Sequence, residues 1–106
     1  MTEEIVILIT VASPDEGAKI AQALVDEHLA ACVNIIPGVR SFFFWEGQSR
    51  EAAEALLICK TTMPLMEAFI ARVKSLHSYT VPEIIALPVT AGLPAYLEWI
   101  RTSVRR

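Results

Sequence analysis

The spacing of apolar residues changes along this chain, and each change predicts where a strand gives way to a helix. Residues 4–11 (EIVILITV) form a continuous β-branched run that is short enough for a strand buried on both faces. Ser13, Pro14 and Glu16 then predict a helix start, because serine caps, proline fits the first helical position and glutamate completes a capping box. The helix should continue to about residue 30 on an apolar stripe of helical spacing. This stripe consists of Ile20, Ala21, Leu24, Val25 and Leu29.

The middle of the chain predicts a long hairpin. Residues 31–36 (ACVNII) are typical of a strand, Pro37 and Gly38 should bend or bulge it, and residues 39–47 should continue it in an extended conformation. A turn at residues 47–49 then leads to a return strand at residues 54–61. Cys59 and Lys60 should point to opposite faces of that strand because side chains alternate.

The last third of the chain predicts a helix, a strand and a short final helix. Thr62 and Pro64 open the helix, whose apolar stripe runs as far as Leu76. Residues 83–89 form a strand bracketed by Pro82 and Pro88, so it should lie at a sheet edge or pair only over its middle. Residues 95–104 form the final helix. The order is βαββαβ with an additional C-terminal helix, an α+β ferredoxin-like sandwich formed by one domain over residues 1–106.

Composition narrows the possible partners. The chain is 54% hydrophobic, yet no apolar run approaches the roughly 18 residues of a membrane span, so the surplus apolar surface should be covered by another copy of the chain. A net charge of −3 without a basic block argues against nucleic acid. The first apolar stretch has no basic residues before it and is followed directly by acidic ones, so it predicts a strand rather than a signal peptide. The two cysteines show no disulfide pattern. We therefore expect reduced thiols in the cytoplasm.

Four consecutive rings, FFFW at residues 42–45, give the most direct structural inference. Alternation puts two rings on each face of a strand, whereas the helices of a two-layer domain cover only one face of its sheet. Phe42, Phe43 and Phe44 should therefore meet a neighbouring chain, because aromatic residues are enriched at interface centres. Packing within a single chain is the alternative.

A polar cluster, HSYTVPE at residues 77–83, follows the second helix. His77 continues the buried stripe and should point inward, either as a metal ligand or as a buried histidine bonded to a backbone carbonyl. Glu83 should either bind a cation together with His77, orient the imidazole ring of His77, or remain an ordinary solvated charge at the strand edge. Tyr79 is either a packing residue with a hydrogen-bonded hydroxyl or a reactive group. The sequence has no phosphate-binding loop, no C-x-x-C and no assembled nucleophile, so we expect no enzymatic activity.

Several separated motifs resemble one family over nearly the whole chain. The segments LAACVNIIPGVRSFFFWEG, LLICKT, LHSYTVPEIIALPV and YLEWI are similar to those of the CutA family of divalent-cation tolerance proteins. The resemblance implies a ferredoxin-like fold and a homotrimer related in architecture to PII signalling proteins. It also implies a cytoplasmic role linked to copper and other divalent metals, and it brings no established reaction.

The resemblance can be checked position by position against the family pattern. Those that match the family pattern are Cys32, Trp45, Gly47, Lys60, His77, Tyr79, Pro82, Glu83, Tyr96 and Trp99. Ser78 stands where proline is usual, and Phe43 stands where tyrosine is common. Some members are assigned copper through a cysteine and two histidines, and the matching positions here are Val11, Leu76 and His77. The thiolate of such a copper(I) site is therefore missing.

These observations lead to one leading hypothesis and two alternatives. The leading hypothesis is a non-enzymatic homotrimer that acts in divalent-metal tolerance. It would hold a metal ion such as copper, through His77 and Glu83, or a small ligand between subunits. That inter-subunit cleft is expected to be lined by Cys32, Trp45, Lys60 and Tyr79, and the trimer interface to contain Phe42, Phe43, Phe44 and Trp99. The alternatives are a PII-like regulatory module that binds a small metabolite and signals to a partner protein, and a scaffold without a ligand.

Overall fold

The order of elements along the chain is the one that the apolar pattern predicts, and the α+β ferredoxin-like prediction is confirmed. The computed structural model describes residues 3–105, so the domain predicted over residues 1–106 reaches beyond the described residues at both ends. The elements are β1 (Glu4–Val11), α1 (Pro14–Asp26), β2 (Cys32–Trp45), β3 (Gln48–Thr62), a 3₁₀ turn (Met63–Leu65), α2 (Met66–Leu76), β4 (Ile84–Pro88) and α3 (Pro94–Ser103). Among the described residues, no helix is long and apolar enough to cross a membrane.

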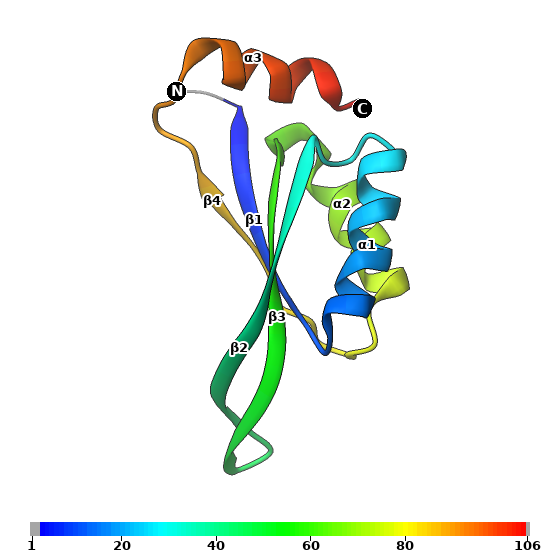
Figure 1. Ribbon diagram of the computed structural model, residues 1–106, viewed down its shortest axis with the longest axis vertical. Helices are drawn as coiled ribbons and strands as arrows, with labels where there is room; N and C mark the ends of the chain where they lie inside the picture. The colour runs from blue at the N-terminus through cyan, green and yellow to red at the C-terminus, as the bar shows by residue number, and fades with distance from the viewer. Residues whose placement is uncertain (1–2, 106) are drawn as a thin grey trace.

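The strands form one antiparallel sheet in the order β2-β3-β1-β4. Strand β1, one of the two interior strands, pairs on one side with β3 and on the other with β4. Strand β4 lies at an edge, which is one of the two arrangements that its prolines predict. Helices α1 and α2 lie side by side against one face of the sheet (Figure 1). This is a two-layer arrangement, with the main core between the helices and that face.

The core follows the alternation of β1 and the stripes of the two helices. Ile5, Ile7 and Ile9 of β1 are 0–5% exposed, and Leu24 of α1 and Phe69 of α2 pack in the same cluster at 0% exposure. Every second residue of β1 therefore faces the helices, which leaves the intervening residues on the opposite face of the sheet.

Two predicted boundaries are wrong. Helix α1 ends at Asp26 rather than near residue 30, because His28 takes a left-handed backbone conformation (φ 61°) and the Leu29 and Ala30 amides both donate to the Leu24 carbonyl. Strand β3 begins at Gln48 rather than at residue 54, because the hairpin turns within Glu46 and Gly47 (φ 51° and 78°).

The long hairpin extends past the rest of the sheet. Pairing of β1 with β3 stops at Val11 opposite Ala55, whereas β2 and β3 continue to pair to Trp45 opposite Gln48, after a bulge between Ile36 and Val39. Residues 39–54, hereafter the ribbon, thus form a two-stranded projection (Figure 1) in a domain 44 Å long. A two-stranded ribbon is marginal in water by itself, so additional packing must hold it in place.

The sheet face opposite α1 and α2 remains partly open. Helix α3 covers one end of it, where the Arg101 guanidinium donates to the Glu4 carboxylate at 2.9 Å. Further along this face Ile36, Ile85 and Leu87 are 43%, 50% and 47% exposed. The face is therefore apolar and only partly covered by the chain itself.

Candidate functional site

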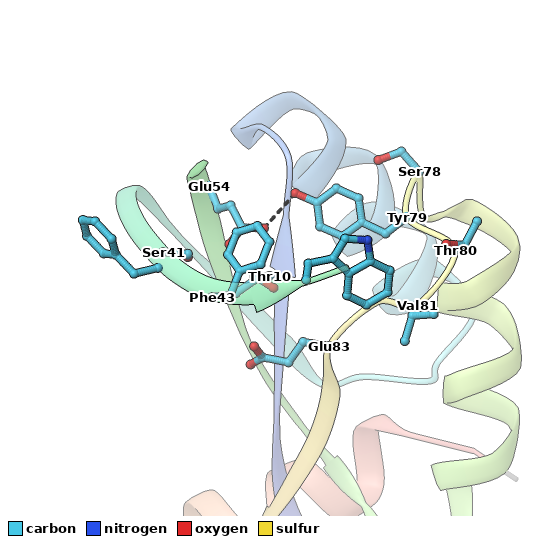
Figure 2. A pocket seen from close by; sticks show the side chains of 11 residues that line it. Thr10, Ser41, Phe43, Glu54, Ser78, Tyr79, Thr80, Val81 and Glu83 are labelled. Atoms are coloured by element: carbon cyan, nitrogen blue, oxygen red, sulfur yellow. Dashed lines mark hydrogen bonds between the residues drawn. The ribbon is translucent and has the colours of Figure 1, made fainter. Parts of the chain in front are cut away.

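A cavity of about 770 Å³ lies where the ribbon leaves the sheet. Its wall comes from three places: the end of β1, the ribbon, and the loop between α2 and β4 (Figure 2). The lining residues are Thr10 of β1, Ser41, Phe42, Phe43, Trp45 and Glu54 of the ribbon, and Ser78, Tyr79, Thr80, Val81 and Glu83 of the loop. The structure thus brings the predicted site residues Trp45, Tyr79 and Glu83 together in one chain.

His77 anchors the loop to the sheet. Its side chain is fully buried at the C-terminal cap of α2, and Nε2 donates to the Thr10 carbonyl at 2.8 Å. Nδ1 accepts the Tyr79 backbone N–H at 3.0 Å, which requires the neutral ring with its proton on Nε2. Both ring nitrogens are therefore engaged in positioning the loop against the end of β1.

Glu16 forms a second tie between the loop and α1. The Ser78 amide and hydroxyl donate to its two carboxylate oxygens at 2.9 and 2.8 Å, and one of those oxygens lies 3.5 Å from His77 Nδ1. Only half of the predicted capping box is seen at the helix start: Ser13 accepts the Glu16 amide, while the Glu16 carboxylate reaches Ser78. Proline at position 78 would supply neither donor.

Tyr79 and Glu54 join the loop to the ribbon. The phenol donates to the Glu54 carboxylate at 2.7 Å, the contact drawn in Figure 2. Partial burial raises the pKa of Tyr79 to about 12, with the hydrogen bond to Glu54 and the charges of Glu54 and Glu16 adding to the effect. The phenol therefore stays neutral over the whole physiological range of pH.

The charge at the cavity is negative. Glu54 and Glu83 both line it, and its described lining contains neither lysine nor arginine. Phe43 and Trp45 share the face of the ribbon that carries Glu54, whereas Phe42 points to the opposite face at its pair with Glu51. Carboxylates and aromatic faces thus lie around the same space.

Two residues predicted to line the same cleft lie elsewhere in the chain. Cys32 pairs with Lys60 at the opposite end of the hairpin from Trp45, and neither residue lines the cavity. There the Lys60 ammonium donates to the Asn34 side-chain carbonyl and lies 3.9 Å from the Cys32 sulfur. Within one chain the predicted cleft residues therefore form two separate groups, and a single cleft from all four would need more than one subunit.

Cys59 lies on the helix-facing side of β3, whereas Cys32 shares the opposite face with Lys60. Burial raises the pKa of the Cys59 thiol to about 12; the nearby Cys32 adds to this rise and Lys60 opposes it. Both cysteines are free thiols. Cys59 is thus a small apolar core residue rather than a reactive group.

The residues present do not make a closed metal site in one chain. Over residues 3–105 no three side chains of histidine, cysteine, aspartate or glutamate gather closely enough to hold an ion. His77 is adjacent to Glu16, whereas Glu83 lines the cavity, and the two ring nitrogens of His77 are already hydrogen-bonded. A metal ion at His77 would have to displace one of those bonds.

The rings predicted to form an interface are accessible in the single chain. Phe42 and Phe44 share one face of the ribbon and are 69% and 74% exposed, while Phe43 and Trp45 on the cavity side are 41% and 43% exposed. Trp99 on α3 is 44% exposed and lies beside Tyr96, with ring centroids 5.4 Å apart. The division of the four consecutive rings between two faces is as the alternation predicts.

Four polar residues of this region were missed by sequence reasoning: Thr10, Glu16, Ser41 and Glu54. A return strand predicted from residue 48 would have revealed Glu54 as a site residue. Alternation along that strand places Glu54 on the same face as Phe43 and Trp45. Glu16 was assigned only a capping role, and its contact with Ser78 crosses 62 positions of sequence. Local patterns carry no signal for such a contact.

Comparison with known proteins gives a consistent family assignment. The family model of the CutA1 divalent ion tolerance protein matches residues 5–103. The divalent-cation tolerance protein CutA of Thermus thermophilus is 52% identical over 98 residues, which are 92% of this chain and 95% of that protein. The solved structure of the divalent cation tolerance protein (Cut A1) from Thermus thermophilus superimposes with a TM-score of 0.95 at 50% identity, covering 96% of this chain and 99% of that one.

A plant relative is longer. Protein CutA, chloroplastic, from Arabidopsis thaliana is 48% identical over 101 residues, which are 95% of this chain but only 56% of the plant protein. The chain thus spans about half the length of that relative. Since the plant protein is named chloroplastic, the cytoplasmic location expected for this chain stays a prediction.

Proposed function

Because this chain belongs to the CutA1 divalent ion tolerance protein family, we propose that it acts in the tolerance of divalent metal ions as a non-enzymatic homotrimer. The observation that supports this role is the match of the family model to residues 5–103. The Thermus thermophilus relative, 52% identical over 98 residues, is named for divalent-cation tolerance and not for a reaction. The proposed role is therefore binding or response rather than catalysis.

The open sheet face and the ribbon support assembly. The face opposite α1 and α2 carries apolar side chains such as Ile85 and Leu87 that are about half exposed, and four exposed rings project on the ribbon. Pairing of the ribbon with an adjacent subunit in closed symmetry would cover this surface and leave no free sheet edge. Phe42, Phe43, Phe44 and Trp99 are the residues proposed to lie at this interface.

Sedimentation velocity and light scattering of the purified protein at micromolar concentration test the assembly. We expect a single species of three chains without detectable monomer, because obligate interfaces couple folding to association. A monomeric mass would overturn the trimer.

Divalent metal is proposed to bind weakly, because a single chain offers an incomplete shell. His77 and Glu83 remain the proposed donors, with His77 releasing the Tyr79 amide and neighbouring subunits completing the coordination. Calorimetric titration of metal-free protein with copper(II) and zinc tests this proposal. Weak binding that disappears in His77→Ala supports the site, whereas tight copper binding that survives His77→Ala overturns it.

A second candidate function is favoured by one observation. A cavity of about 770 Å³ with convergent polar groups and exposed rings has the size and chemistry of a small-molecule site. We propose as the alternative a PII-like module that binds a small metabolite there and passes the signal to a partner protein. Titration of the metal-free protein with a panel of nucleotides and other small metabolites separates it from a purely metal-dependent role.

A further inference from the structure

We propose that the imidazole of His28 and residues 103–105 form a pH-sensitive clasp, which holds the residues after α3 while the ring is neutral and loosens when the ring is protonated. This inference goes beyond the proposed function and does not depend on it, because the contacts are hydrogen bonds within one chain. His28 lies in the loop between α1 and β2. Figure 1 shows the end of α3 beside this loop, at the end of the domain away from the ribbon.

Three hydrogen bonds make the clasp. The ring Nδ1 lies 3.3 Å from the Ser103 carbonyl oxygen, and Nε2 lies 2.9 Å from a guanidinium nitrogen of Arg105. The Arg105 amide also donates to the His28 carbonyl at 3.0 Å. Residues 103–105 are thus held by both the ring and the backbone of a residue 75 to 77 positions earlier in the chain.

The bonding partners determine the protonation state of the ring. A carbonyl oxygen can only accept and a guanidinium group can only donate, so Nδ1 must carry the proton and Nε2 must accept. This neutral tautomer is the opposite of that of His77, whose proton is on Nε2. The clasp is therefore formed by a neutral His28.

Protonation has different effects on the two sides of the ring. At Nδ1 the bond to Ser103 is kept, and a positive charge is favourable beside the last carbonyls of a helix. At Nε2 the acceptor becomes a second donor, which faces the Arg105 guanidinium, so the hydrogen bond is lost and two positive charges are in contact. Arg105 should therefore leave the ring while the end of α3 stays in place.

The ion pairs and charged hydrogen bonds of the neighbouring elements do not involve this ring. They are Asp26 with Gln22 on α1, Glu27 with Arg72 between α1 and α2, Lys60 with Asn34 between β3 and β2, and Arg101 with Glu4 between α3 and β1. Arg105 is the charged side chain that bonds to the ring. Its guanidinium therefore decides how the clasp responds to protonation.

The loop that carries His28 is firmly held, so protonation should act on the residues after α3 and not on the loop. His28 has a left-handed backbone conformation (φ 61°), which residues other than glycine adopt uncommonly. The amides of the next two residues both donate to the Leu24 carbonyl, and the Thr61 hydroxyl donates to the Leu29 carbonyl at 2.7 Å. Residues 104 and 105, in contrast, lie outside regular secondary structure.

Nuclear magnetic resonance of the full, nitrogen-15-labelled chain tests the clasp, because the chain has two histidines whose ring signals can be told apart. At pH 8 we expect His28 to carry its proton on Nδ1 and His77 on Nε2. Imidazole groups ordinarily change charge at about pH 6.5, so pH 8 and pH 5 compare the two states. The backbone order parameter of Arg105 should fall from about 0.85 at pH 8 to below about 0.6 at pH 5, while that of Ser103 stays at about 0.85.

Two variants separate the clasp from other effects of acid. His28→Asn is the matched control, because asparagine tolerates the left-handed backbone, can still donate to the Ser103 carbonyl and does not titrate. In this variant the order parameter of Arg105 should be the same at pH 8 and pH 5. Arg105→Met keeps the apolar stem and removes the charge, so position 105 should likewise show no response to pH.

Three results would overturn the proposal. One is a His28 ring protonated on Nε2 at pH 8, and another is an Arg105 order parameter that does not change between pH 8 and pH 5. The third is an equal change in His28→Asn, which would assign the loosening to other groups. Because the clasp lies within one chain, its failure would leave the proposed homotrimer and its metal binding untouched, and a monomeric mass in sedimentation would not refute the clasp.

Discussion

Replacing Arg101 with methionine tests an ion pair whose carboxylate, that of Glu4, is buried. The Glu4 carboxylate is buried with a side-chain exposure of 0%, and its only hydrogen bond among the described residues comes from Arg101, at 2.9 Å. Its second oxygen has no hydrogen-bond partner within residues 3–105. Arg101→Met keeps the apolar stem of the side chain but leaves a buried charge without a partner.

The expected loss is large because of this burial. Removing one partner of a buried ion pair costs about 3–5 kcal/mol, and we expect the lower end, about 3 kcal/mol per chain, because the Arg101 side chain is itself 44% exposed. Glu4→Gln should cost less, about 1 kcal/mol, because a neutral amide is cheaper to bury and Arg101 can turn to water. The double variant should therefore be more stable than Arg101→Met alone.

Urea unfolding followed by circular dichroism measures these differences. All variants must be compared at one protein concentration, because association shifts apparent stability. With a slope of about 2 kcal/mol/M, the midpoint of Arg101→Met should fall by roughly 1.5 M. Arg72→Met, which breaks the solvent-exposed pair with Glu27 at 2.9 Å, is the matched control and should change the midpoint far less.

Two results would refute the reasoning. One is a midpoint for Arg101→Met no lower than that of Arg72→Met, which would mean that Glu4 reaches water once its partner is gone. The other is a double variant no more stable than Arg101→Met, which would mean that the loss comes from packing of α3 rather than from an unpaired carboxylate.

Three further predictions follow from the ribbon, the loop and the cysteines. Replacing Phe43 and Trp45 together with glutamate should cause unfolding or aggregation, because the ribbon depends on packing at its aromatic faces; a folded, monomeric variant in light scattering would contradict this. Tyr79 should ionise with a pKa of about 12, raised from its ordinary value of 10, so its contribution to stability is complete below pH 10 and lost as pH rises through about 12. An ultraviolet titration compared with Tyr79→Phe checks this, and ionisation of Tyr79 near pH 10 would disprove it. Cys59 should resist iodoacetamide until denaturant is added, and mass spectrometry should find no disulfide to Cys32 in the native protein; rapid native labelling of Cys59 is the contrary result.

Local patterns were sufficient for the order of elements. The β-branched run of β1 and the Ser13-Pro14 start of α1 lie where the sequence predicts them, since periodicity and capping depend on neighbours along the chain. The prolines around β4 likewise favour an edge strand or one paired only over its middle, because a missing amide donor restricts pairing whatever the rest of the fold does, and β4 lies at the edge. Division of the FFFW rings between two faces followed from alternation alone.

The tertiary structure decided which of these residues meet. Trp45, Tyr79 and Glu83 gather at one cavity because the ribbon leaves the sheet beside the loop after α2, whereas Cys32 and Lys60 are carried to the far end of the same hairpin by its register. The partners of the loop are also long-range: Glu54 bonds to Tyr79 and Glu16 to Ser78. Periodicity assigns a side chain to a face but does not say what lies opposite it. That depends on strand register and on the packing of distant segments, which only the folded chain determines.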